Sequence, residues 1–410
     1  MGPSVKVCRS KLILGDTDPR NAASLSSLQL GGPDGIQATK LCMLRQTNDG
    51  NTGYVVALGC GKSLALGLAQ FPEQAFDTEQ VKGVKNPVPA TIGDTVCLKL
   101  GESLENRIQS VSARGELVAA SDSQCGCIVA RVSTTIDNLE DLVSEDCPSH
   151  KLRRIDSASV VARKSSATTW VGDNNCMKGW TGVALSPTLP TVAVTSSLGR
   201  KTVLRDIESG TETGEFWHDL NPMALSYYNE NCLVIGEWGT LTLWDTREGK
   251  KLKFANAPLS GRAPIYSISA DTSRVAVVGE SKSLSLLDTR TWKSYLSWKV
   301  PIKHDAVGVK LTGNASRCFV AGLDHELVGF SVDEMNKKGC APDGGSREKL
   351  QTPQSLPQGS MLHQNHRMFR SEATWAGFDV FGESLCGSSS CTEFVGLSTS
   401  SVLYTGHYSF

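Results

Sequence analysis

Short apolar runs, each bounded by turn-forming residues, recur along the chain. Val275–Val278 and Leu233–Ile235 are rich in residues that favour strands buried between sheets. Each run is followed by a turn that contains glycine. An alternating run such as Ser283–Leu287 comes next, and alternation suits a strand with two different faces. Because helical periodicity is nearly absent, the pattern predicts an all-β protein built from short strands.

These units repeat at a regular spacing. Four of them share an alternating apolar run that ends on a polar residue: Asp206, Asp245, Asp288 and Ser331. A spacing of roughly 40–45 residues, with four short strands in each unit, is typical of β-propeller blades. Three weaker repeats complete the set: Gly53–Ala69, Glu116–Arg131 and Glu393–His407. We therefore predict a seven-bladed β-propeller that forms a single domain over residues 1–410.

The weaker repeats stand farther from their neighbours than one blade requires. We interpret the excess as three loop insertions, at about 70–94, 133–156 and 334–362, since proline, glycine and polar residues dominate there. The second insertion contains the acidic run 137–146, whose apolar residues have helical spacing. That run is either a solvated loop, which we favour, or a short amphipathic helix offered to a partner.

The N-terminal run Val5–Leu14 has the composition of a strand. The last repeat reaches only its third strand before the sequence ends, which leaves an unpaired edge in the final blade. Unpaired strand edges promote aggregation. We therefore predict that Val5–Leu14 supplies the missing fourth strand and closes the ring.

The charge balance gives no reason to expect a polyanionic partner. Lys plus Arg number 41 and Asp plus Glu 42, so the net charge is −1. This balance argues against general attraction to nucleic acid or to a membrane surface, and no apolar run is long enough to span a bilayer. Thirteen cysteines without a repeating framework are typical of reduced thiols. We expect a cytoplasmic or nuclear location, or both, and other proteins as partners.

Motifs that carry chemistry are incomplete in this sequence. Gly59–Ser63 resembles a phosphate-binding loop, but that loop requires glycine where Val56 stands, so a hairpin turn is favoured. Cys125 and Cys127 are too close together for the usual zinc pair. A metal site would need to combine other cysteines and histidines: Cys386, Cys391, His363 and His366. We therefore predict no catalytic residue, no metal and no cofactor, and we expect a protein that is not an enzyme.

Two repeats end on related motifs. Trp244–Arg247 reads Trp-Asp-Thr-Arg, and Leu287–Arg290 is the same ending with Leu for Trp. These endings resemble the WD40-repeat family, and the repeat rhythm covers roughly 38–410. The resemblance implies a non-enzymatic scaffold or adaptor that supports assembly of a multiprotein complex, for example one that processes RNA or modifies ribonucleoproteins. The Gly-His pair that usually opens such repeats is missing, so the His–Ser–Trp–Asp hydrogen-bond network of strong repeats is not expected.

The two Asp-Thr-Arg endings have two interpretations. In the structural one, the aspartate caps the turn and the arginine lies over the neighbouring blade. In the functional one, arginines on adjacent blades present their guanidinium groups to a partner. The Trp-Asp-x-Arg ending also resembles that of WD proteins that dock on the cullin-4 ligase adaptor. This resemblance implies the alternative function of a substrate receptor. The candidate partner-binding residues are Trp244, Asp245, Arg247, Asp288 and Arg290.

Overall fold

The computed structural model describes most of the chain. The described residues are 4–15, 26–27, 37–46, 53–71, 89–100, 103–132, 168–170, 179–256, 263–312, 315–332, 366–386 and 389–409. Every regular element in this part of the chain is a β-strand. None of it forms a helix with the length and apolar character needed to cross a membrane.

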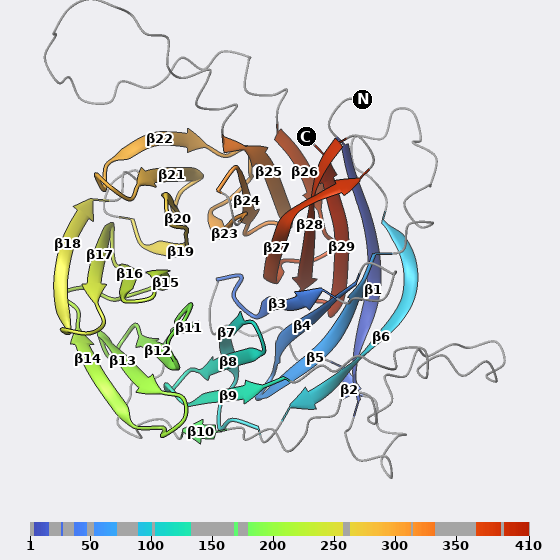
Figure 1. Ribbon diagram of the computed structural model, residues 1–410. Coiled ribbons are helices and arrows are strands. Elements are labelled where there is room, and N and C mark those ends of the chain that lie inside the picture. Colours follow the sequence, from blue (N-terminus) through green and yellow to red (C-terminus); the bar gives the residue numbers. More distant parts are fainter. Residues whose placement is uncertain are drawn as a thin grey trace, which may run out of the picture.

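The strands form seven four-stranded antiparallel blades around a central axis, which confirms the predicted fold (Figure 1). Blade 1 consists of β3 (Leu41–Gln46), β4 (Gly53–Cys60), β5 (Ser63–Gln70) and β6 (Ala90–Leu100). Blade 2 consists of β7 (Ile108–Arg114), β8 (Leu117–Asp122), β9 (Cys127–Arg131) and β10 (Thr168–Trp170). Blade 3 consists of β11 (Thr181–Leu185), β12 (Thr191–Ser196), β13 (Lys201–Asp206) and β14 (Glu212–Trp217).

The remaining blades follow in chain order. Blade 4 consists of β15 (Ala224–Asn229), β16 (Cys232–Gly236), β17 (Thr240–Asp245) and β18 (Lys250–Asn256). Blade 5 consists of β19 (Ile265–Ala270), β20 (Arg274–Gly279), β21 (Ser283–Asp288) and β22 (Ser294–Lys299). Blade 6 consists of β23 (Ala306–Leu311), β24 (Arg317–Gly322), β25 (Glu326–Ser331) and β26 (His366–Arg370). Blade 7 consists of β27 (Trp375–Cys386), β28 (Ser389–Ser398), β29 (Val402–Ser409) and β1 (Ser4–Gly15).

The predicted repeat pattern locates the third strand of each blade. β13, β17, β21 and β25 end on the four polar residues that defined the strong repeats. The weaker repeats cover the second and third strands of blades 1, 2 and 7. The sequence pattern is clear here because these strands are short, buried and joined by local turns.

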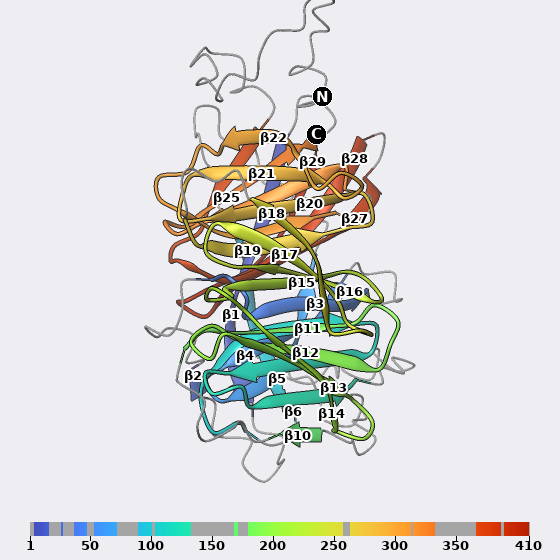
Figure 2. The same cartoon turned by 90° about the vertical axis from the view of Figure 1, so that its left-hand side faces the viewer.

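The antiparallel order gives the ring two distinct faces. The face that carries the first turn of each blade, between its first and second strands, is called the lower face. It also carries the connection between the third and fourth strands. The upper face carries the turn between the second and third strands and the connections from one blade to the next. Figure 2 views the ring from the side of β14, β18 and β22.

The N-terminal strand closes the ring as predicted. β1 pairs antiparallel with β29, from Ser4 opposite Ser409 to Lys11 opposite Val402. The sequence did not indicate a second pairing, in which β1 runs parallel to β6 of blade 1. Because β6 pairs with β5 over Leu64–Leu66, blades 1 and 7 share one nine-stranded sheet, which includes the short strand β2 (Ser26–Ser27).

The three predicted insertions leave the ring at the same kind of position. They join the third and fourth strands of blades 1, 2 and 6, so all three begin and end on the lower face. Residues 90–94, which the sequence assigned to the first insertion, form the start of β6. Most of each insertion, including the acidic run 137–146, lies outside the described residues.

Deletion of residues 1–15 tests the closure. Without β1, the edges of both β29 and β6 lose their partner, so we expect the cooperative thermal transition to collapse. Calorimetry measures this directly. Lys11→Ala serves as the control because this exposed side chain lies on the same strand, and it should change the free energy of unfolding by less than about 0.5 kcal/mol. An unchanged melting curve after the deletion contradicts the closure.

Candidate functional site

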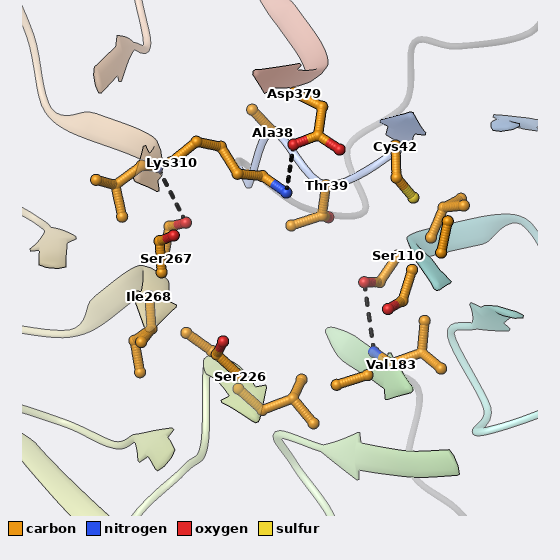
Figure 3. Close-up of a pocket in the computed structure, with 18 of the residues that line it drawn as sticks. Ala38, Thr39, Cys42, Ser110, Val183, Ser226, Ser267, Ile268, Lys310 and Asp379 are labelled. Carbon is orange, nitrogen blue, oxygen red and sulfur yellow. Dashed lines mark hydrogen bonds and ion pairs between the residues drawn. The ribbon is translucent and has the colours of Figure 1, made fainter. Parts of the chain in front are cut away.

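The innermost strands of the blades surround a central channel of about 350 Å³ (Figure 3). Two Ser-x-Ser pairs line it, on β7 and on β19. The Ser110 and Ser112 hydroxyls accept backbone N–H bonds from blade 3, each at 3.3 Å. Ser267 and Ser269 accept the equivalent bonds from blade 6, at 3.1 and 3.0 Å. These serines therefore join neighbouring blades at the inner edge of the ring.

An ion pair between blades 6 and 7 lies in the wall of the channel, next to the point where the ring closes. The Lys310 ammonium lies 3.1 Å from Asp379 Oδ1, and Asp379 Oδ2 accepts the backbone N–H of Met43 at 3.0 Å. Burial alone lowers the pKa of Lys310, but the facing carboxylate more than offsets this and raises it above its ordinary value. The contacts link blades 6, 7 and 1. The sequence analysis missed both residues because they lie far apart in the sequence and share no motif.

The described residues contain no group of three or more His, Cys, Asp or Glu side chains that could hold a metal ion. Gly59–Ser63 forms the predicted hairpin turn between β4 and β5, with Gly61 at a φ of +57°. Cys125 lies in the turn before β9, and burial raises the pKa of the Cys127 thiol. Cys386 and Cys391 lie on paired strands of blade 7, and His363 lies outside the described residues.

Trp244 occupies the interior of blade 4. Its ring stacks on Phe216 of blade 3 with centroids 5.0 Å apart. Its indole N–H donates to Thr242 Oγ1 at 3.1 Å, and the Thr242 hydroxyl donates to Glu237 Oε1 at 2.9 Å. The same oxygen lies 3.3 Å from His218 Nδ1. This blade therefore has a different network from the His–Ser–Trp–Asp one, in which threonine and glutamate connect His218 to Trp244.

The network converges on a buried carboxylate. Thr202 Oγ1 lies 2.8 Å from His218 Nε2, so a hydroxyl that donates there leaves Nδ1–H to donate to Glu237. Burial raises the pKa of Glu237, but hydrogen bonds from His218, Thr242 and the Leu220 N–H more than offset it, so that pKa is lowered. The carboxylate thus fixes the turn that contains Glu237 to the connection that contains Leu220.

The Asp-Thr-Arg turns lie on the lower face of blades 4 and 5. Asp245 accepts bonds from the Arg247 Nε and Nη2 atoms at 3.2 and 2.9 Å, which help lower the pKa of Asp245 to about 2. Asp288 caps its turn in the same way, and Arg290 Nη2 lies 3.3 Å from it. The arginine side chains are 65% and 88% exposed. The aspartates therefore cap their turns, as the structural interpretation predicts, and each arginine pairs with its own aspartate.

Four exposed apolar side chains lie at the upper face of blades 3 and 4, and we call them the upper patch: Leu198, Trp217, Leu220 and Trp238. Trp217 is 65% exposed and Trp238 is 44% exposed. The loops that carry them are hydrogen-bonded to one another. The backbone carbonyl oxygen of Arg200 accepts the His218 N–H, and Arg200 Nε donates to Asn221 Oδ1. The Leu220 N–H donates to the Glu237 carboxylate. Hydrogen bonds between these loops therefore fix the position of the upper patch. The sequence analysis missed the patch because its residues come from separate turns.

The fold defines the chain as a seven-bladed β-propeller, with an apolar patch on its upper face and self-paired arginine turns on its lower face. No protein-family model matches the chain. A comparison with curated proteins also finds no match.

Glu237→Gln tests the buried network. Loss of the charge leaves His218 and Thr242 with a weaker acceptor, so we expect the free energy of unfolding to fall by about 1.5–3 kcal/mol. Glu280→Gln is a matched control because Glu280 follows the glycine of the equivalent turn in blade 5 but is exposed. Urea titration of both variants provides the comparison, and equal stabilities contradict the structural role of Glu237.

Proposed function

We propose that this chain is a non-enzymatic scaffold that binds other proteins through the loops of its faces. Propellers commonly serve this purpose because rigid blades hold loops in fixed positions, which lowers the entropy cost of binding. The observation that carries the proposal is the upper patch. Single exposed apolar residues are ordinary, whereas tryptophans and leucines gathered on hydrogen-bonded loops mark an interaction surface.

The finer proposal concerns the kind of assembly. The two Asp-Thr-Arg turns, the histidines at 363 and 366, and the run Ala373-Thr374-Trp375 follow one another in an order that resembles WD repeat-containing protein 73. The resemblance to methylosome protein 50 is weaker. We infer a place in the WD40 family and a role in assembling complexes that process RNA or modify ribonucleoproteins, in the cytoplasm, the nucleus or both.

Affinity purification followed by mass spectrometry tests the scaffold role. The double variant Leu220→Ser/Trp238→Ser removes the apolar side chains but keeps the backbone bonds of both loops. We expect it to lose specific protein partners and to keep its melting temperature. Leu252→Ser is the control, since this leucine is exposed on β18, away from the upper patch. Unchanged partners in the double variant contradict the role of the upper patch, and RNA-processing subunits among the lost proteins support the finer proposal.

The exposed arginines favour a second candidate, a substrate receptor that docks on a cullin-4 ligase adaptor. Arg247→Ala/Arg290→Ala removes both guanidinium groups and leaves the buried Trp244 in place. If the lower face docks on the adaptor, the variant should lose adaptor subunits in the same purification. Retention of all partners by the folded variant contradicts this candidate.

A further inference from the structure

The lower face differs from one side of the ring to the other. Its long connections belong to blades 1, 2 and 6, and the free ends of β29 and β1 lie on the same face in blade 7. Blades 3, 4 and 5 have short turns there: 207–211, 246–249 and 289–293. We call the lower face of these three consecutive blades the open side, a name defined only by their short turns.

A groove of about 600 Å³ lies on this open side. Its walls come from the first turns of blades 3, 4 and 5. Thr188 lines it from blade 3, Glu230 and Asn231 from blade 4, and Asp271 from blade 5. Because these turns are tied to rigid strands, the groove exists without a bound partner.

Two carboxylates line the groove, and neither forms an ion pair with a described residue. Glu230 accepts one bond at each oxygen, from Thr188 at 3.1 Å and from Asn231 at 3.2 Å. Asp271 Oδ1 accepts the Thr272 N–H at 2.6 Å, and no donor among the described residues reaches Oδ2. Since a carboxylate offers about four acceptor positions, both groups keep capacity for further donors.

A tyrosine hydroxyl supplies an independent observation. Tyr227 lines the groove, and its hydroxyl oxygen is buried with no hydrogen-bond partner among the described residues. Burial also raises the pKa of Tyr227 above its ordinary value, so the hydroxyl stays protonated. A buried polar atom without a partner is unfavourable, and a ligand that hydrogen-bonds to it removes that cost.

The protein's own nearby cations do not fill this role. Arg114 lies close enough to Tyr227 to oppose part of the rise in its pKa, but its guanidinium donates to the backbone carbonyl oxygens of Thr188 and Leu189 and not to the hydroxyl. Arg247 lines the groove, but Asp245 holds its guanidinium with two hydrogen bonds and neutralises its charge. The groove therefore keeps an excess of negative charge and of hydrogen-bond acceptors. The complementary group is cationic and offers only donors, and guanidinium, with five N–H donors in a plane, fits both requirements.

We propose that this groove binds an arginine-bearing segment of a partner polypeptide, with the guanidinium between Glu230 and Asp271 and within reach of the Tyr227 hydroxyl. The proposal rests on the scaffold function and names the chemistry of one partner. It concerns the lower face, whereas the upper patch lies on the opposite face. The two surfaces can therefore be tested separately.

Fluorescence anisotropy of the full-length protein with a labelled Gly-Arg-Gly-Arg-Gly peptide tests the proposal. The wild type should bind this peptide and should bind Gly-Glu-Gly-Glu-Gly at least tenfold more weakly. Binding should weaken as the salt concentration rises, because the attraction is electrostatic. If the arginine peptide does not bind, or if the two peptides bind equally, the proposal is wrong, while the purification result for the upper patch still stands.

Variants locate the binding. Glu230→Gln/Asp271→Asn should weaken the arginine peptide at least tenfold. Glu208→Gln/Glu212→Gln is the matched control, since it removes two exposed carboxylates from the lower face of blade 3 outside the groove and should change affinity less than twofold. Wild-type affinity in the groove variant, or equal losses in both pairs, overturns the proposal.

Two further variants separate ligand binding from structure. Tyr227→Phe should weaken peptide binding about threefold or more and leave the melting temperature unchanged or higher, because the hydroxyl has no partner among the described residues. Unchanged affinity contradicts the role of the hydroxyl. Lys151, Arg153 and Arg154 form a basic run in the connection 132–167. If their replacement by alanine raises peptide affinity severalfold, the chain itself occupies the groove and the assignment to a partner is wrong.

Discussion

The seam between blades 7 and 1 is the constraint on which the propeller depends. Five of the blades form separate four-stranded sheets, whereas blades 7 and 1 share one sheet through β1. The outer edge is closed by β1, between β29 and β6. The inner edge is closed by Lys310, Asp379 and the Met43 N–H, and between these edges the Tyr54 hydroxyl donates to the buried Glu393 carboxylate. The upper patch and the groove on the lower face both require this closure, since an open ring loses the fixed spacing of its loops.

Away from the seam, contacts between blades 3 and 4 fix the positions of their loops. The Glu237 carboxylate takes donors from Thr242 on the third strand of blade 4 and from His218 and Leu220 in the connection out of blade 3. Such a buried network is stable only when all its members are paired. The cost of burying a charge is offset by three donors, and the result is a pair of loops whose apolar side chains remain exposed. A flexible loop could collapse Leu220 and Trp238 onto the ring, whereas these loops are held in place.

Local patterns in the sequence predicted the elements that are themselves local. The sequence predicted the ends of the third strands because the alternating run and the turn residues are adjacent in the chain. These strands end at Asp206, Asp245, Asp288 and Ser331. The β1–β6 pairing and the Lys310–Asp379 pair were missed since their partners lie far apart in sequence and share no motif. Glu237 and Glu280 show the limit clearly. They occupy the same position of related turns, but Glu237 is buried, with partners in the connection out of blade 3, whereas Glu280 is exposed.

The two faces of the ring offer different chemistry, and this difference suits a scaffold. The upper patch is apolar, with Trp217 and Trp238 exposed on hydrogen-bonded loops. The groove on the lower face has two carboxylates and an acceptor-rich lining. Because apolar burial changes little with salt and charge pairing weakens as salt rises, the two surfaces respond differently to the same solution. Under the two proposals, a partner suited to one face has no reason to bind the other, and a propeller that uses both faces would hold two unlike partners separated by the thickness of its blades.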